Sequence, residues 1–88
     1  SKLQNLKLLN LNFNNIKKIP IEIENLVNLE KLILCYNKID EIPIEICNLK
    51  NLKQLNLHGN QLEKIPIEIK NLSNIEIINL GRNKIETI

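Results

Sequence analysis

Apolar positions recur along this 88-residue chain at a fixed interval of 23 residues. Within each interval, apolar residues such as Leu9 and Leu11 alternate with variable ones, which is the period of a strand with one buried face. The first three sets of equivalent apolar positions begin at Leu6, Leu9 and Leu11. A column of asparagines follows without exception: Asn14, Asn37, Asn60 and Asn83. The pattern predicts one domain over residues 1–88, built from four units that begin at residues 6, 29, 52 and 75.

The second half of each unit has a different pattern. The run Ile-Pro-Ile-Glu-Ile occurs at residues 19–23, 42–46 and 65–69. Proline has a fixed φ and no backbone donor, so we expect it in the first turn of a short helix. The glutamate two residues later favours the positive end of that helix, and we interpret it as helix support rather than as a catalytic group. The helices are expected to end at the asparagines that tolerate left-handed geometry, Asn25, Asn48 and Asn71.

One strand and one helical turn make each unit a single coil, which cannot bury its apolar face alone. Stacked coils would align their strands about 4.8 Å apart in a curved parallel sheet, with the strands on the inner, concave face. The expected core columns are Leu9, Leu32, Leu55 and Ile78, together with Ile23, Ile46 and Ile69. Ile21, Ile44 and Ile67 either pack sideways between coils or stay partly exposed. The asparagine column is predicted to be buried and to bond to its own turn and to the next repeat.

The repeated motif L-x-x-L-x-L-x-x-N, present in all four units from residue 6 to residue 83, resembles the leucine-rich repeat. The 23-residue length and the Ile-Pro-x-Glu-Ile half are similar to the intracellular repeats of Ras-pathway scaffolds, Scribble-type polarity proteins and bacterial repeat proteins. This resemblance implies an α/β solenoid with a parallel sheet on the concave face and short helical turns on the convex face. It also implies scaffolding in signal transduction, through a protein partner bound on the concave face.

The variable positions of the concave face hold both aromatic residues, the only histidine and the only arginine. Phe13 and Tyr36 occupy equivalent places, so their rings should be neighbours and could anchor a partner. Alternatively, they only cover the edge between strand and turn. His58 has no second ligand at metal spacing, and we expect it to face solvent or a partner. The candidate partner-binding residues are Leu8, Asn10, Asn12, Phe13, Lys31, Ile33, Cys35, Tyr36, Gln54, Asn56, His58, Ile77, Asn79 and Arg82.

Charge and cysteine content narrow the class of protein. The net charge of +2, with lysines and glutamates interspersed, argues against a nucleic-acid or membrane partner. No apolar run approaches the roughly 20 residues of a membrane helix, and Ser1 begins no signal peptide. Cys35 and Cys47 fit neither a metal site nor a disulfide framework, because they fall on opposite sides of one coil. We therefore expect a cytoplasmic protein without a cofactor.

Nothing in the sequence predicts an enzyme. Two serines and two glycines are too few for a nucleophile elbow or a phosphate loop, and the glutamates form one convex column. Three functions remain: an interaction module, a structural or self-assembling array, and the recognition arm of a larger enzyme or effector. Residues 3–5 match the tail of a preceding repeat, the chain stops at Ile88 within a unit, and neither end has a polar cap. We expect a piece of a longer array, or end-to-end self-association through the uncapped repeats.

Overall fold

The computed structural model describes residues 2–86, so Ser1, Thr87 and Ile88 lie outside the described residues. Short 3-10 helices alternate with three-residue strands along the chain. The helices are η1 (Lys2–Asn5), η2 (Ile21–Asn25), η3 (Ile44–Asn48) and η4 (Ile67–Asn71). The strands are β1 (Leu8–Asn10), β2 (Lys31–Ile33), β3 (Gln54–Asn56) and β4 (Ile77–Asn79).

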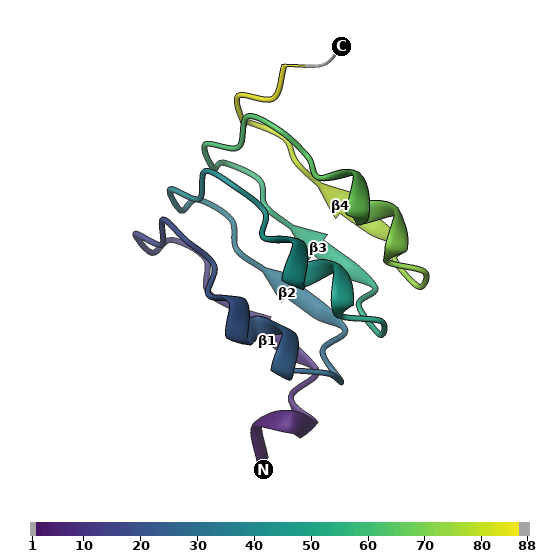
Figure 1. Cartoon of the computed structure of the whole chain (residues 1–88). Helices are drawn as coiled ribbons and strands as arrows, with labels where there is room; N and C mark the ends of the chain where they lie inside the picture. The colour runs from purple at the N-terminus through teal and green to yellow at the C-terminus, as the bar shows by residue number, and fades with distance from the viewer. Residues whose placement is uncertain (1, 87–88) are drawn as a thin grey trace.

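The four strands form one parallel sheet in the order β1-β2-β3-β4. The register follows the repeat, since Leu9 pairs with Leu32, Leu32 with Leu55, and Leu55 with Ile78. Helices η2, η3 and η4 make a second layer along the sheet (Figure 1). Each unit is therefore one coil of a solenoid, with a strand on one side and a 3-10 helix on the other, as the sequence predicts.

Each proline of the Ile-Pro-Ile-Glu-Ile runs lies one position earlier than expected. Pro20 is extended, with φ −67° and ψ 147°, and helix η2 begins at the next residue. Its carbonyl accepts the first bond of the turn, from the Ile23 N–H at 3.1 Å. Proline fits this cap because its fixed φ suits both extended and helical backbone. Glu22 follows in the first turn, as predicted.

The asparagines that end these helices are not left-handed, so that prediction was wrong. Helix η2 instead ends with Leu26 at φ −84° and ψ 65°, and the Leu26 N–H donates to the Ile23 carbonyl. A 3-10 turn this short closes through such a bond and needs no left-handed residue. Among residues 2–86, positive φ occurs on the other side of each coil, at Phe13, Tyr36, Gly59 and Arg82.

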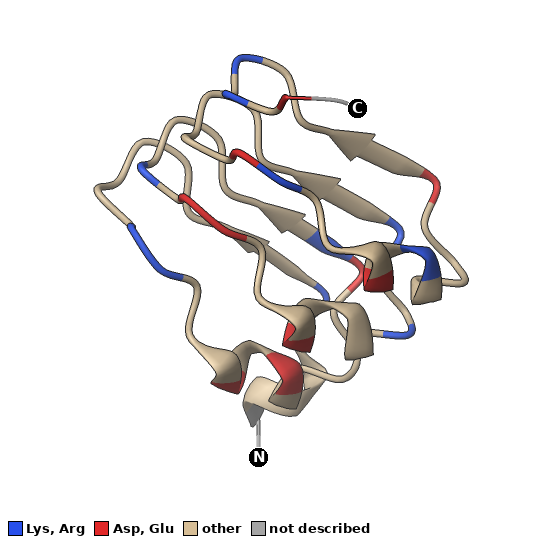
Figure 2. Cartoon of the chain, turned by 45° about the horizontal axis from the view of Figure 1, so that its top comes forward, with Lys and Arg blue, Asp and Glu red and all other residues tan. Residues whose placement is uncertain are grey.

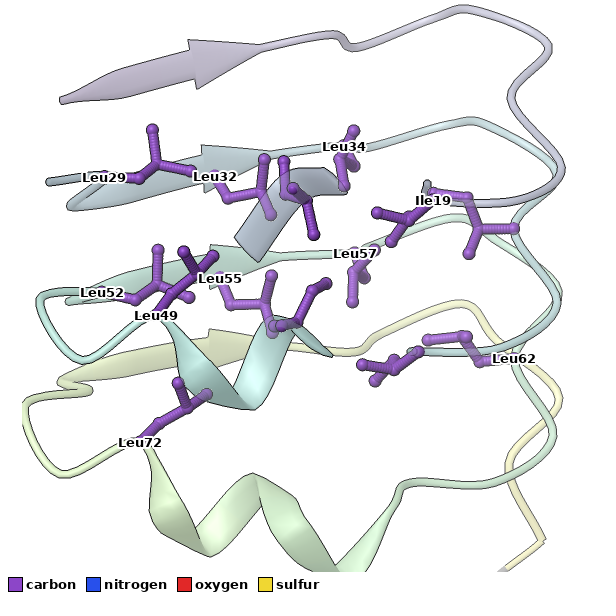
Figure 3. Packing of buried hydrophobic residues seen from close by; sticks show 14 residues of the cluster. Ile19, Leu29, Leu32, Leu34, Leu49, Leu52, Leu55, Leu57, Leu62 and Leu72 are labelled. Carbon is purple, nitrogen blue, oxygen red and sulfur yellow. The ribbon is translucent and has the colours of Figure 1, made fainter. Parts of the chain in front are cut away.

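The hydrophobic core fills the space between the sheet and the helices (Figure 3). Leu32, Leu55 and Ile46 are fully buried in the two inner coils, and Ile23 is nearly so. Ile78 was wrongly expected in the core: it is 38% exposed, because no described coil covers the outer side of β4. Leu9 and Ile69 are partly buried for the same reason, at the first and last coils. The middle isoleucines Ile21, Ile44 and Ile67 are exposed.

The asparagine column forms a continuous ladder beside this core. Asn37 and Asn60 are each only 6% exposed. The Asn60 Nδ2 group donates to the carbonyls of Leu57 in its own turn (3.0 Å) and of Leu34 in the preceding coil (2.9 Å). Its Oδ1 atom accepts the Ile39 N–H at 3.0 Å. The predicted burial is confirmed for these two residues. The predicted direction was wrong, because each amide reaches back to the preceding repeat.

Both cysteines are free thiols buried within the second coil. Burial, with a smaller contribution from the carboxylate of Glu68, raises the pKa of the Cys47 thiol. We therefore expect Cys47 to react far more slowly with Ellman's reagent at about pH 8 than a free cysteine does, because little thiolate forms. A Cys35→Ser variant isolates this thiol. Full reaction in guanidinium within the dead time, but slow reaction without denaturant, is the expected result. Equal rates in both conditions would contradict it.

Candidate functional site

The strand side of the solenoid presents equivalent positions from successive coils. Pairing in register places Leu8 beside Lys31, Lys31 beside Gln54, and Gln54 beside Ile77. We define the strand face as the candidate residues that keep accessible surface. Its exposed members are Leu8, Asn10, Phe13, Lys31, Tyr36, Ile77, Asn79 and Arg82, and its half-buried members are Asn12, Ile33, Gln54, Asn56 and His58.

Cys35 does not belong to this surface, contrary to expectation. Only 9% of the residue is exposed, because its position on the strand-to-turn segment turns it into the coil. Its backbone N–H donates to the Oδ1 atom of Asn12 in the preceding coil at 2.7 Å. Cys35 therefore helps to hold the second coil against the first rather than to form the strand face.

Three rings form an aromatic row across the first three coils. Phe13 and Tyr36 are stacked, with centroids 5.0 Å apart and planes inclined by 10°. Tyr36 then meets His58 edge to face, at 5.4 Å and 77°. The predicted neighbourhood of Phe13 and Tyr36 is confirmed. The inclusion of His58 was missed, although its place one residue before the Tyr36 column was a usable signal.

The only two glycines of the chain lie beneath this aromatic row. A Cβ atom on Gly59 would come within 2.6 Å of Tyr36 Cδ1, and one on Gly81 within 2.8 Å of His58 Nδ1. Tyr36 and His58 thus each occupy space that would be filled by the side chain of any residue larger than glycine at the equivalent position of the next coil. The glycines set where the rings of Tyr36 and His58 can lie.

The row also coincides with unusual backbone geometry. Phe13 has φ +59°, Tyr36 +57° and Arg82 +50°, and the equivalent residue Gly59 has φ +76°. The chain turns at this position in every coil. A bulky side chain with left-handed backbone is an outlier, at a cost of roughly 1–2 kcal/mol per residue. Gly59 in this column was the sequence signal for the turn, and it was overlooked.

Several asparagines of the strand face are engaged in local structure. The Oδ1 atoms of Asn10, Asn56 and Asn79 each accept the N–H two residues further on, at 3.0–3.2 Å. The second coil has Ile33 at this place, which cannot accept, and there the Asn12 amide of the first coil supplies the bond. These amides hold the strand-to-turn geometry, so part of the variation along this face is structural.

Four basic residues on or next to the strand face lack ion-pair partners. Lys31 and Arg82 lie on the strand face, while Lys38 and Lys84 follow the asparagine ladder, and none of these four has an ion-pair partner within residues 2–86. The ion pairs of the described residues join Lys18 to Asp40 at 2.9 Å and to Glu41 at 3.5 Å, and Lys53 to Glu30 at 3.9 Å just before strands β3 and β2. Hydrogen bonding to Asp40 raises the pKa of Lys18 and lowers that of Asp40. Further acidic residues mark η2, η3 and η4 on the opposite side (Figure 2).

Two hollows lie outside the strand face. An open groove of about 430 Å³ runs between Lys18, Asp40, Ile44 and Pro66, and an apolar hollow of about 270 Å³ opens the interior of the first coil beside Leu11. Among residues 2–86, no group of three His, Cys, Asp or Glu residues is arranged to hold a metal ion. No helix in this part of the chain combines the length and apolar character needed to span a bilayer.

A parallel sheet in 23-residue register, an asparagine ladder and one short helix per coil define a repeat solenoid. The chain belongs to the leucine-rich repeat region family, whose profile matches residues 1–88.

Two solved structures show the same fold. A leucine-rich repeat protein of Leptospira interrogans is 44% identical, with a TM-score of 0.94 over 99% of this chain and 22% of that one. The plant peptide hormone receptor RGFR1, in complex with RGF2, is 41% identical, with a TM-score of 0.83 over 93% of this chain and 14% of the receptor. A comparison with curated protein sequences gives no match. The chain thus spans less than a quarter of either neighbour.

Proposed function

We propose that this chain is a protein-interaction module whose strand face binds a protein or peptide partner, with the aromatic row as the anchor. The observation that carries the proposal is the identity of the left-handed residues. Glycine adopts this geometry freely, as at Gly59, yet the other three coils place Phe13, Tyr36 and Arg82 there. Backbone strain retained under large side chains is characteristic of residues that serve in binding.

A purely structural role for the row is less well supported. Phe13 remains 75% exposed and Tyr36 44% exposed, so their contact leaves much apolar surface in water. Glycine in both positions would close the same turn without strain. Aromatic side chains that stay accessible on a rigid scaffold are the type that anchors interfaces.

The comparisons support the same class of function. The peptide hormone receptor RGFR1, which shares the fold over 14% of its chain, was solved in complex with RGF2. Binding, rather than catalysis, also agrees with the acidic residues, since Glu22, Glu45 and Glu68 stand in the first turns of three successive helices. A recognition arm of a longer protein would use the same strand face. Self-association through the open end coils stays a prediction.

Selection of a displayed random-peptide library on the immobilised chain tests the proposal. We expect enriched peptides to lose binding to the double variant Phe13→Ala, Tyr36→Ala, because it removes the row and keeps a Cβ in the same backbone geometry. The control is Ile67→Ala on the helix side, since Ile67 is 71% exposed and so matches Phe13. Circular dichroism verifies that both variants are folded. Enriched peptides that bind the double variant as well as the original chain, or no enrichment at all, would contradict the proposal.

A further inference from the structure

We infer that the partner segment is an acidic peptide that also carries apolar side chains. This inference rests on the proposed function of the strand face and adds the chemistry of its ligand. It follows from the distribution of charge around the aromatic row and from the way in which the rings are packed.

The charges on the strand face itself and along its rim are all positive. Lys31 and Arg82 lie on the strand face, and Lys38 and Lys84 line its rim, without a carboxylate on the same positions of any described coil. Of the carboxylates close to these cations in sequence, those of Asp40 and Glu41 are bonded to Lys18, and that of Glu30 lies 3.9 Å from the Lys53 ammonium group. The four cations therefore have no internal counter-charge. A ligand that brings carboxylates to this face would gain complementary charge pairing at the second and fourth coils.

The aromatic row adds to the same preference. Phe13 and Tyr36 stack face to face, and Tyr36 also lies against Gly59 and the ring of His58 in the third coil. What Tyr36 offers to a ligand is its edge and its hydroxyl group. Ring edges carry the positive part of the aromatic quadrupole, so they accept aliphatic groups and carboxylates in preference to cations.

This packing also distinguishes a peptide from single-stranded nucleic acid, the other polyanion that basic and aromatic surfaces bind. Such binding needs free ring faces on which successive bases stack. One face of Tyr36 is covered by Phe13, and the ring is also crowded by Gly59 and by the ring of His58, so the row does not present a series of free faces. We therefore assign the surface to an acidic peptide.

Fluorescence anisotropy with labelled probes tests this assignment on the complete chain. The probes are a peptide that alternates glutamate with leucine, the same peptide with lysine for glutamate, the same peptide with serine for leucine, and oligo(dT). We expect the glutamate–leucine peptide to bind most tightly and its affinity to fall as salt is raised. The double variant Lys31→Glu, Arg82→Glu should weaken this binding at least about tenfold. The control Lys64→Glu, Lys70→Glu has the same net charge and should leave the affinity within about twofold.

The outcomes separate this inference from the proposed function. Equal or tighter binding of the lysine peptide would overturn the acidic assignment, while the function would stand if Phe13→Ala, Tyr36→Ala abolished that binding. Equal binding of oligo(dT) would assign the surface to nucleic acid. Equal loss in both charge variants would place the site elsewhere. Failure of every probe would overturn the acidic peptide, and the library selection would then decide the function independently.

Discussion

Replacement of Asn60 by alanine is expected to lower the free energy of unfolding by about 3 kcal/mol, although Asn60 contacts no ligand. The side chain is buried and bonds to both its own coil and the preceding one. Alanine would leave the Ile39 N–H without its acceptor and remove one donor from each of two buried carbonyls. For a domain of this size, the loss corresponds to a fall in Tm of roughly 12–24 °C.

The ladder geometry explains why this effect should be large. The Leu34 carbonyl lies between the amides of Asn37 and Asn60, and the Leu57 carbonyl lies between those of Asn60 and Asn83. Each amide thus polarises a chain of hydrogen bonds that runs through the coils. Loss of an inner member breaks the chain, whereas loss of an end member shortens it.

Asn14→Ala is the matched control, because it removes the same side chain from an exposed end coil. Its amide group donates only within its own turn, to the carbonyls of Leu11 and Asn12. We expect a loss below about 1 kcal/mol for this variant. Urea unfolding followed by circular dichroism measures both. Similar losses for Asn14→Ala and Asn60→Ala, or a negligible loss for Asn60→Ala, would contradict a special role for buried ladder amides.

Gly59→Ala is the second substitution with a large expected effect. It places a side chain on backbone with φ +76°, and its Cβ would lie 2.6 Å from the Tyr36 ring. We expect a loss of about 2–3 kcal/mol, of which roughly 1–2 kcal/mol is backbone strain and the rest is displacement of the ring. Tyr36 is the only tyrosine and the chain has no tryptophan, so intrinsic fluorescence reports on the ring directly.

A double-mutant cycle separates the two contributions. In a Tyr36→Ala background, Gly59→Ala should cost only the backbone strain, because the ring that it displaces is gone. Arg82→Gly is the converse control at the equivalent position, and it should stabilise the chain by about 1 kcal/mol by relieving the strain at φ +50°. Identical losses of unfolding free energy for Gly59→Ala in both backgrounds would show that the absence of a Cβ at Gly59 does not determine the position of the Tyr36 ring.

The repeat period allowed the fold to be predicted almost completely. Leu32 and Leu55 are buried because each has a coil on either side, and a 23-residue column expresses that arrangement directly. The same column was misleading for Ile78, because an equivalent position in the repeat does not show whether a further coil covers that residue. Burial of an amide such as Asn37 was predictable from its apolar surroundings, but the direction of its bonds depends on the stagger between coils.

The candidate site was predicted in outline only. Equivalence of Phe13 and Tyr36 sufficed to place their rings together. The left-handed turn at these residues was predictable from Gly59, which stands in the same column. It was wrongly expected at Asn25, where the short helix closes through a different hydrogen bond. The Oδ1 atom of Asn12 accepts the Cys35 N–H from the neighbouring coil, where Ile33 stands in place of the asparagine that accepts this bond in the other coils. A hydrogen bond supplied by a neighbouring coil in this way cannot be predicted from the sequence of one repeat alone.

The in-register pairing of strands fixes how a gene for this chain can change in length. One residue inserted between Leu32 and Asn37 would shift that coil against both neighbours and reverse which side chains point inward. Removal of residues 29–51 would instead join Asn28 to Leu52, the same junction that Asn51 now makes, and would return every column to a matching partner. Growth and loss in such a protein should therefore proceed by duplication or deletion of whole coils, each of which adds or removes one strip of the strand face.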